Sequence, residues 1–184
     1  PLLSWENGSD IAWSNMRIYV SSDGQDDSGD GSLVFPYATI QKAINESFSG
    51  DTVLVSPGNY IENIDYNEKK IIVASEYLIT GDTSLVSSTL IQGESSGYVA
   101  TLNGSLIGFT IQGGYSDFQE TDGIYVPQQD DGTHILLSNI EVRGCKIYNG
   151  SGVAITLETS SVTLENLKLI DNQDQYNSDG VLLI

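Results

Sequence analysis

From Thr52 to the C-terminus, the sequence is a succession of short apolar segments separated by Gly, Asn, Asp and Ser. Such segments, bounded by turn residues, predict short β-strands and therefore an all-β domain. A short strand cannot bury its apolar face alone, so the segments must either pack as two sheets or stack as the coils of a solenoid. The choice depends on whether the segments repeat along the chain.

The segments do repeat. Ser138–Gly150 aligns with Ser160–Asn172 at an offset of 22 residues, and Phe109 falls over Cys145 at an offset of 36. A third alignment, with spacings of 29 and 28 residues, joins the segments that begin at Gly123, Gly152 and Gly180. A repeat that carries three short strands predicts a single-stranded parallel β-helix. The alternative, a jelly-roll or immunoglobulin-like sandwich, would need hairpins, and no Asn-Gly turn here is flanked by paired alternations.

One stretch, Ala38–Phe48, has helical periodicity, and Thr39 can cap its start. Its apolar stripe consists of Ile40, Ala43, Ile44 and Phe48. A solenoid needs such a cover, because its first coil exposes apolar side chains and unpaired strand edges. We therefore predict two parts, with an N-terminal strand, an acidic loop and a capping helix in residues 1–50 and β-helix coils in residues 51–184.

The last residues, Val181–Ile184, are an apolar strand that no polar cap follows. This predicts a chain truncated from a longer β-helix, or a final coil covered by another subunit. An uncovered coil would offer an end-to-end or homo-oligomeric contact.

Charge limits the class of partner. The chain has 25 acidic and 7 basic residues among 184, a formal net charge of −18. Nucleic acid and anionic membrane surfaces need clustered Lys and Arg, so both are excluded as partners. No apolar run approaches the ~18 residues of a membrane span, which excludes membrane insertion. A single Cys and a single His argue against a cysteine zinc site and a histidine-centred triad.

Three segments resemble the start of the pectin-lyase-like, right-handed parallel β-helix superfamily: Tyr19–Gly24, Phe35–Ile44 and Gly50–Tyr60. The resemblance implies a right-handed coil with an N-terminal helix cap. It also implies a bacterial protein that is secreted or held at the cell surface, with polysaccharide as its partner. Because the superfamily includes lyases, hydrolases, esterases, adhesins and phage spikes, it does not fix an activity.

A polysaccharide lyase needs a base and a cation that neutralises the uronate carboxylate, and calcium often serves as that cation in this superfamily. The candidate catalytic residues are Lys146, Lys168 and Arg143, with Arg143 placed over Glu165 by the 22-residue alignment. The alternative is a row of solvated side chains with one surface ion pair, worth at most ~1 kcal/mol. A glycoside hydrolase is less favoured than a lyase, because the hydrolase signatures of the superfamily are missing.

Two further groups of side chains are candidates for ligands. Asp23, Asp26, Asp27 and Asp30 lie among glycines in one loop, which suggests calcium. The loop lacks the ligand spacing and the closing Glu of an EF-hand, so an Asp/Gly turn cluster is the favoured interpretation. Tyr125 and Tyr148 are candidates for stacking on sugar rings, although surface tyrosines are common.

These observations predict an extracellular β-helix domain of undefined activity, a polysaccharide-binding or surface-displayed module of a larger secreted protein. A calcium-assisted, pectate-lyase-like fragment is the first alternative. A structural stalk or adhesin is the second.

Overall fold

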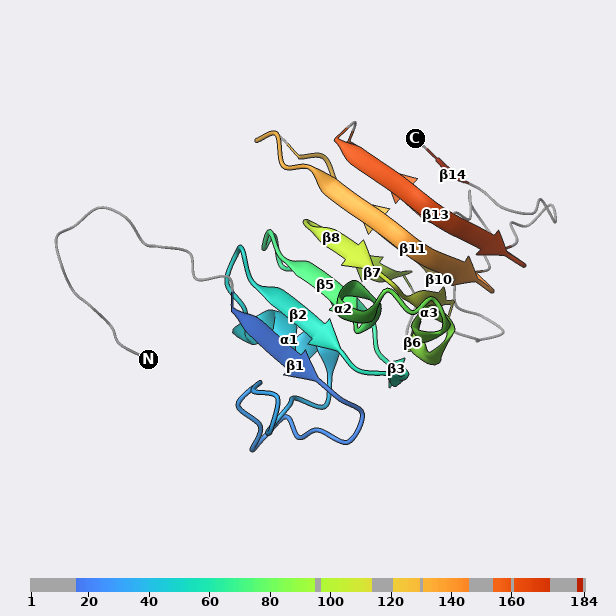
Figure 1. Cartoon of the computed structure of the whole chain (residues 1–184). Helices are drawn as coiled ribbons and strands as arrows, with labels where there is room; N and C mark the ends of the chain where they lie inside the picture. The colour runs from blue at the N-terminus through green and yellow to red at the C-terminus, as the bar shows by residue number, and fades with distance from the viewer. Residues whose placement is uncertain are drawn as a thin grey trace, which may run out of the picture.

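The computed structural model describes residues 16–94, 97–113, 121–129, 131–145, 154–159, 161–172 and 182–183. In this part of the chain, the strands build a stack of coils with three faces (Figure 1). No helix among the described residues is long and apolar enough to cross a membrane.

Every strand pair of the described stack is parallel, and each coil adds one strand to each face. The first face consists of β1 (Arg17–Val20), β2 (Thr52–Val55), β5 (Ile72–Ser75), β8 (Ser105–Ile107), and the first halves of β11 (Ile135–Arg143) and β13 (Val162–Ile170). The second face consists of β3 (Gly58–Ile61), β6 (Thr89–Gln92), β9 (Thr110–Gln112) and the second halves of β11 and β13. The third face consists of β4 (Ile64–Asp65), β7 (Gly97–Thr101), β10 (Thr121–Val126), β12 (Ile155–Leu157) and β14 (Leu182–Leu183). The predicted parallel β-helix is confirmed.

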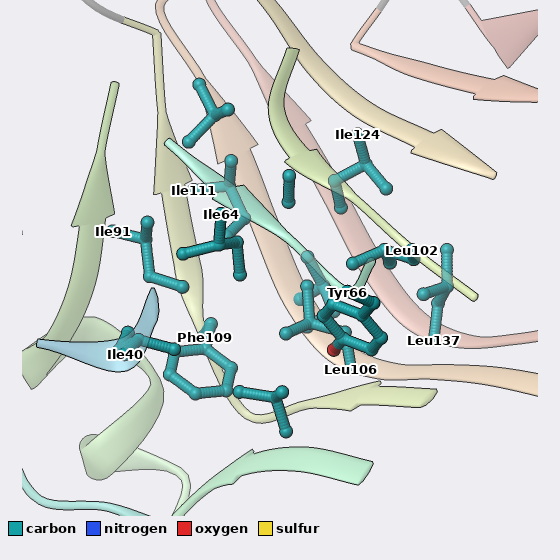
Figure 2. Packing of buried hydrophobic residues seen from close by; sticks show 14 of the residues in the cluster. Ile40, Ile64, Tyr66, Ile91, Leu102, Leu106, Phe109, Ile111, Ile124 and Leu137 are labelled. Carbon is teal, nitrogen blue, oxygen red and sulfur yellow. The ribbon is translucent and has the colours of Figure 1, made fainter. Parts of the chain in front are cut away.

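Apolar side chains from successive coils fill the interior (Figure 2), and the register of the strands aligns them in three columns. The column of the first face is Val53, Val73, Leu106 and Leu137; that of the second is Tyr60, Ile91, Ile111 and Val142; that of the third is Ile64, Ala100, Ile124 and Ile155. All of these side chains are buried. Parallel strands bury apolar side chains well when branched residues alternate with outward-facing polar ones, which explains the alternation in the sequence.

The predicted alignments between coils are wrong in detail. Leu137 pairs with Leu164 and Ile140 with Leu167, an offset of 27 residues rather than 22. Ile111 pairs with Val142, at an offset of 31, so the expected pairing of Phe109 with Cys145 does not form. On the third face Ile155 pairs with Ile124 and Leu182. The offsets differ because loops of different length join the faces, and no fixed spacing can describe them.

The capping helix is α1 (Ile40–Glu46), and Thr39 accepts a hydrogen bond from the backbone N–H of Lys42, as predicted. Ile40, Ala43 and Ile44 are buried in the common core with β1 and β2. Phe48, expected on the same apolar stripe, is 72% exposed. The helix ends before Phe48, and the Asp51 carboxylate accepts the Phe48 N–H in the turn that follows, so Phe48 does not continue the helical face.

The short helices α2 (Tyr77–Thr80) and α3 (Ser84–Ser88) are inserted between β5 and β6, on the outer side of the coils. Figure 1 shows α2 in front of β5 and α3 beside β6. α3 packs near β6, β9 and β11 and so forms one wall of a groove at the corner between the first and second faces.

Candidate functional site

The third face carries a row of outward side chains that crosses the coils. Asp65 pairs with Thr101, and Thr101 pairs with Tyr125, so one position on β4, β7 and β10 lines up along the stack. The residue before each of these is buried: Ile64, Ala100 and Ile124. Because neighbouring residues of a strand point to opposite sides, the buried column holds this outer row in place.

A groove of about 760 Å³ lies at the end of this row. Its lining comes from three consecutive coils: Asp65, Asn67 and Glu68, then Thr101 and Asn103, then Tyr125, Pro127, Gln128 and Gln129. Adjacent strands are about 4.8 Å apart, so side chains from three coils span about 10 Å along the stack. We call this the Tyr125 groove.

Tyr125 is held rigidly at the groove. Its ring stacks on that of Tyr98, with centroids 4.7 Å apart and planes inclined by 17°. Its hydroxyl donates a hydrogen bond of 2.6 Å to Oε2 of Glu158. This bond to a carboxylate, with some burial, raises the pKa of Tyr125 to about 12, so the hydroxyl stays a donor at neutral pH. The aromatic surface is therefore fixed before any ligand arrives.

The polar lining of the groove is partly ordered by the backbone. Asn67 and Glu68 adopt left-handed conformations, with φ of 51° and 62°. The Asn67 N–H donates to Oδ1 of Asp65 at 2.7 Å, and the Asp65 N–H donates to the Gln41 side chain. Amide and carboxylate groups at fixed positions beside an aromatic ring are the combination that orients a polar ligand with an apolar face.

A second, smaller groove of about 260 Å³ lies beside α3. It is lined by Thr83, Val86, Asn139, Ile140, Glu141, Asn166 and Lys168. Lys168, one of the predicted catalytic residues, is next to Glu141 in the register of β13 and β11. An ammonium and a carboxylate on adjacent strands leave little net charge for an anionic sugar.

Two of the three predicted basic residues, Arg143 and Lys168, lie beside the same carboxylate, Glu141. Arg143 Nε donates to Oε1 of Gln112 at 3.1 Å, and its Nη1 lies 3.4 Å from Glu141. The expected position over Glu165 is wrong, because Arg143 pairs with Ile170. Lys146 and Tyr148 lie outside the described residues. The catalytic roles of Lys146, Lys168 and Arg143 and the sugar-binding role of Tyr148 stay predictions.

The acidic loop uses two of its four aspartates in the fold. Asp26 Oδ1 accepts the N–H groups of Ala38 and Thr39, and its Oδ2 accepts the Thr39 hydroxyl. The Ser32 hydroxyl, and then the Ser32 N–H that Asp30 accepts, lower the pKa of Asp30. Among the described residues, which include Asp23 and Asp27, no three His, Cys, Asp or Glu side chains are grouped so that they could hold a metal ion. The turn-cluster interpretation accounts for Asp26 and Asp30, and calcium binding by the loop stays a prediction.

Sequence reasoning named Tyr125 as a candidate but did not identify the residues around it. Asp65 and Glu68 belong to one coil, Thr101 to the next and Glu158 to a later one, and these residues share no motif. The one signal that could have found them is the register of the third face, because the outer row follows directly from it.

Comparison with known proteins places the chain in a family. Residues 22–181 match the family described as "Protein of unknown function (DUF1565)". The chain belongs to this family. A search of curated proteins found no match.

Among solved structures, the DUF1565 chain is similar to a pectin methylesterase from Aspergillus niger, with a TM-score of 0.48 and 16% sequence identity. The match covers 91% of this chain and 60% of the methylesterase chain. The chain thus spans about 60% of the length of the methylesterase chain.

Proposed function

We propose that this DUF1565 domain is a polysaccharide-binding module whose ligand lies in the Tyr125 groove. The observation that carries the proposal is the Tyr125 ring, fixed by Tyr98 and Glu158 at the edge of a groove with a polar lining. Sugar rings present an apolar face and a rim of hydroxyls, which such a surface matches.

The stacked coils favour binding without rearrangement. The groove side chains stand on β4, β7 and β10 or directly after them, and these strands are held by parallel pairing and a buried column. A preorganised site loses less conformational entropy on binding, so modest contacts suffice for measurable affinity. The groove also runs across the coils, along the direction in which an extended glycan could lie.

The test replaces Tyr125 in two ways and measures binding to a panel of soluble oligosaccharides by calorimetry. Tyr125→Ala removes the stacking surface, which we expect to cost about 2 kcal/mol, more than tenfold in Kd. Tyr125→Phe keeps the ring and loses only the hydrogen bond to Glu158, so it should retain most of the affinity. Thermal unfolding of both variants checks that the fold is intact.

Lys168→Ala is the matched control, because Lys168 lines the other groove. It should bind the oligosaccharides as the unmodified chain does. Equal binding by Tyr125→Ala and the unmodified chain would exclude the Tyr125 groove as the site. Absence of binding to every glycan would instead favour a structural stalk or adhesin.

The proposal includes a location. A module that binds polysaccharide acts where such polymers are found, so secretion or display at the cell surface belongs to the same hypothesis. Immunodetection of the native protein in culture supernatant and surface fractions tests it, and recovery with cytosolic markers alone would contradict it.

A further inference from the structure

The charged side chains that line the Tyr125 groove are all acidic among the described residues. Asp65 and Glu68 line it, both exposed, and no Lys or Arg does so among the described residues. Glu158 adds a third carboxylate next to the Tyr125 hydroxyl. A charged ligand in this groove would therefore meet negative groups of the protein on more than one side.

The two lysines that follow Glu68 in the chain are engaged elsewhere. Lys69 Nζ donates to the backbone oxygens of Ile44 and Asn45 in the last turn of α1, at 2.7 and 2.8 Å. Lys70 forms an ion pair with Asp131. Neither ammonium is available to neutralise Asp65 or Glu68 without losing these contacts.

We propose that the Tyr125 groove selects glycans with protonated amino groups, in the manner of a polymer of glucosamine, and rejects polyuronates. This inference rests on the proposed polysaccharide-binding function and names its substrate class. The ring of Tyr125 supplies the surface for the sugar face, and Asp65 and Glu68 supply acceptors for ammonium groups. A uronate chain would place carboxylates against these groups in a protein of net charge −18, which opposes both encounter and binding.

The test compares three oligosaccharides of equal length with the same β-1,4-linked gluco backbone: glucosamine, N-acetylglucosamine and glucuronate. Calorimetry is carried out at low salt and at a pH where the amines are protonated. We expect the glucosamine oligomer to bind about fivefold tighter than the neutral N-acetylglucosamine oligomer, the difference expected from partly exposed ion pairs. The glucuronate oligomer should bind most weakly, and added salt should reduce the differences.

The double variant Asp65→Asn, Glu68→Gln keeps the size of both side chains and removes their charge. It should bind the glucosamine and N-acetylglucosamine oligomers with nearly equal affinity. The control pair Asp27→Asn, Glu94→Gln removes the same charge from positions that do not line the groove and should keep the fivefold preference.

The outcomes separate the two proposals. Binding that depends on Tyr125 but is tightest for glucuronate, or that needs calcium and is abolished by a chelator, would overturn the amino-sugar inference and leave polysaccharide binding in place. Loss of the preference in the control pair would also overturn it, because net charge rather than the groove would then be responsible. Binding of all three oligomers that is unaffected by Tyr125→Ala would contradict both proposals.

Discussion

At the corner between the first and second faces, equivalent residues of three successive coils have a left-handed backbone conformation. Gly108, Asn139 and Asn166 follow one another in register, with φ of 80°, 55° and 52°. Gly and Asn are the residues that adopt left-handed conformations at least cost, so the corner restricts the sequence at this position. The Asn166 side chain also donates to Oδ1 of Asn139 at 3.3 Å.

Although all three residues have a positive φ, Gly and Asn cannot replace one another at each of these positions. A Cβ at Gly108 would lie 2.4 Å from the Ser75 hydroxyl and 2.8 Å from Cβ of Tyr77, the first residue of α2. We therefore expect Gly108→Asn to destabilise the fold by about 2 kcal/mol or more, through overpacking rather than backbone strain. Asn139→Gly, at the next coil, should change the free energy of unfolding by less than about 1 kcal/mol.

Urea unfolding followed by circular dichroism measures the free energy of unfolding of both variants. A variant Asn139→Ala, which keeps a side chain but lacks the Asn preference, should cost about 1–2 kcal/mol and serves as the control for backbone strain. Equal stability of Gly108→Asn and the unmodified chain would show that Tyr77 and α2 move away at no cost, contrary to this interpretation.

At the scale of the element, α1 begins between two carboxylates. Glu62 accepts the N–H groups of Ile40 and Gln41, at 2.9 and 2.8 Å, and Asp26 accepts those of Ala38 and Thr39. Glu62 is buried, and this burial raises its pKa despite the two hydrogen bonds. The first N–H groups of a helix need acceptors, which explains why an acidic side chain lies in this apolar setting.

The direction of this pKa shift predicts a pH dependence. Because the folded protein holds the Glu62 proton more tightly than the unfolded chain, Glu62 contributes most to stability below its unfolded pKa. That contribution is lost as pH rises through the higher folded pKa. Glu62→Gln should lack this pH dependence. The difference in free energy of unfolding between the two proteins should therefore change with pH only between the unfolded and the folded pKa of Glu62.

At pH values where Glu62 is ionised, Glu62→Gln should also be less stable by about 1–3 kcal/mol, because one amide oxygen cannot serve both N–H groups as two carboxylate oxygens do. Urea unfolding across a pH series measures both the difference in unfolding free energy between the two proteins and the change of this difference with pH. Glu46→Gln is the control, because Glu46 is an exposed partner of Lys42. It should leave the pH dependence of unfolding free energy that Glu62 causes unchanged. A difference that grew with rising pH would contradict the assigned direction.

For the whole molecule, the sequence was enough to predict the architecture and not the alignment of its coils. Alternating Val, Ile and Leu predicted parallel strands and an inner column, and Ile40, Ala43 and Ile44 predicted the cap. The coils could not be aligned, because α2 and α3 lengthen one connection and polar loops lengthen others. The Tyr125 groove was missed for the same reason, since its residues meet only when the register is correct.

The stacking of coils makes stability depend on position along the column. Leu137 and Leu164 are equivalent residues of adjacent strands, β11 and β13. Leu137 is fully buried between β8 and β13, whereas Leu164 is only partly buried against the core. A leucine surrounded on all sides leaves a cavity when it is truncated, while a site at the edge of the packing relaxes or fills with water.

Leu137→Ala should therefore cost about 2–5 kcal/mol of unfolding free energy, and Leu164→Ala clearly less. The two leucines share residue type, face and strand direction. The comparison therefore measures the effect of the neighbouring coils that pack on each side chain. Urea unfolding gives both free energies, and native-state hydrogen exchange should show faster opening of β13 than of β5 or β8. If the two substitutions cost the same, Leu164 must be covered as completely as Leu137 in solution. The measurement would then have to be repeated at several protein concentrations, because cover by a second copy would make the cost of Leu164→Ala rise with concentration.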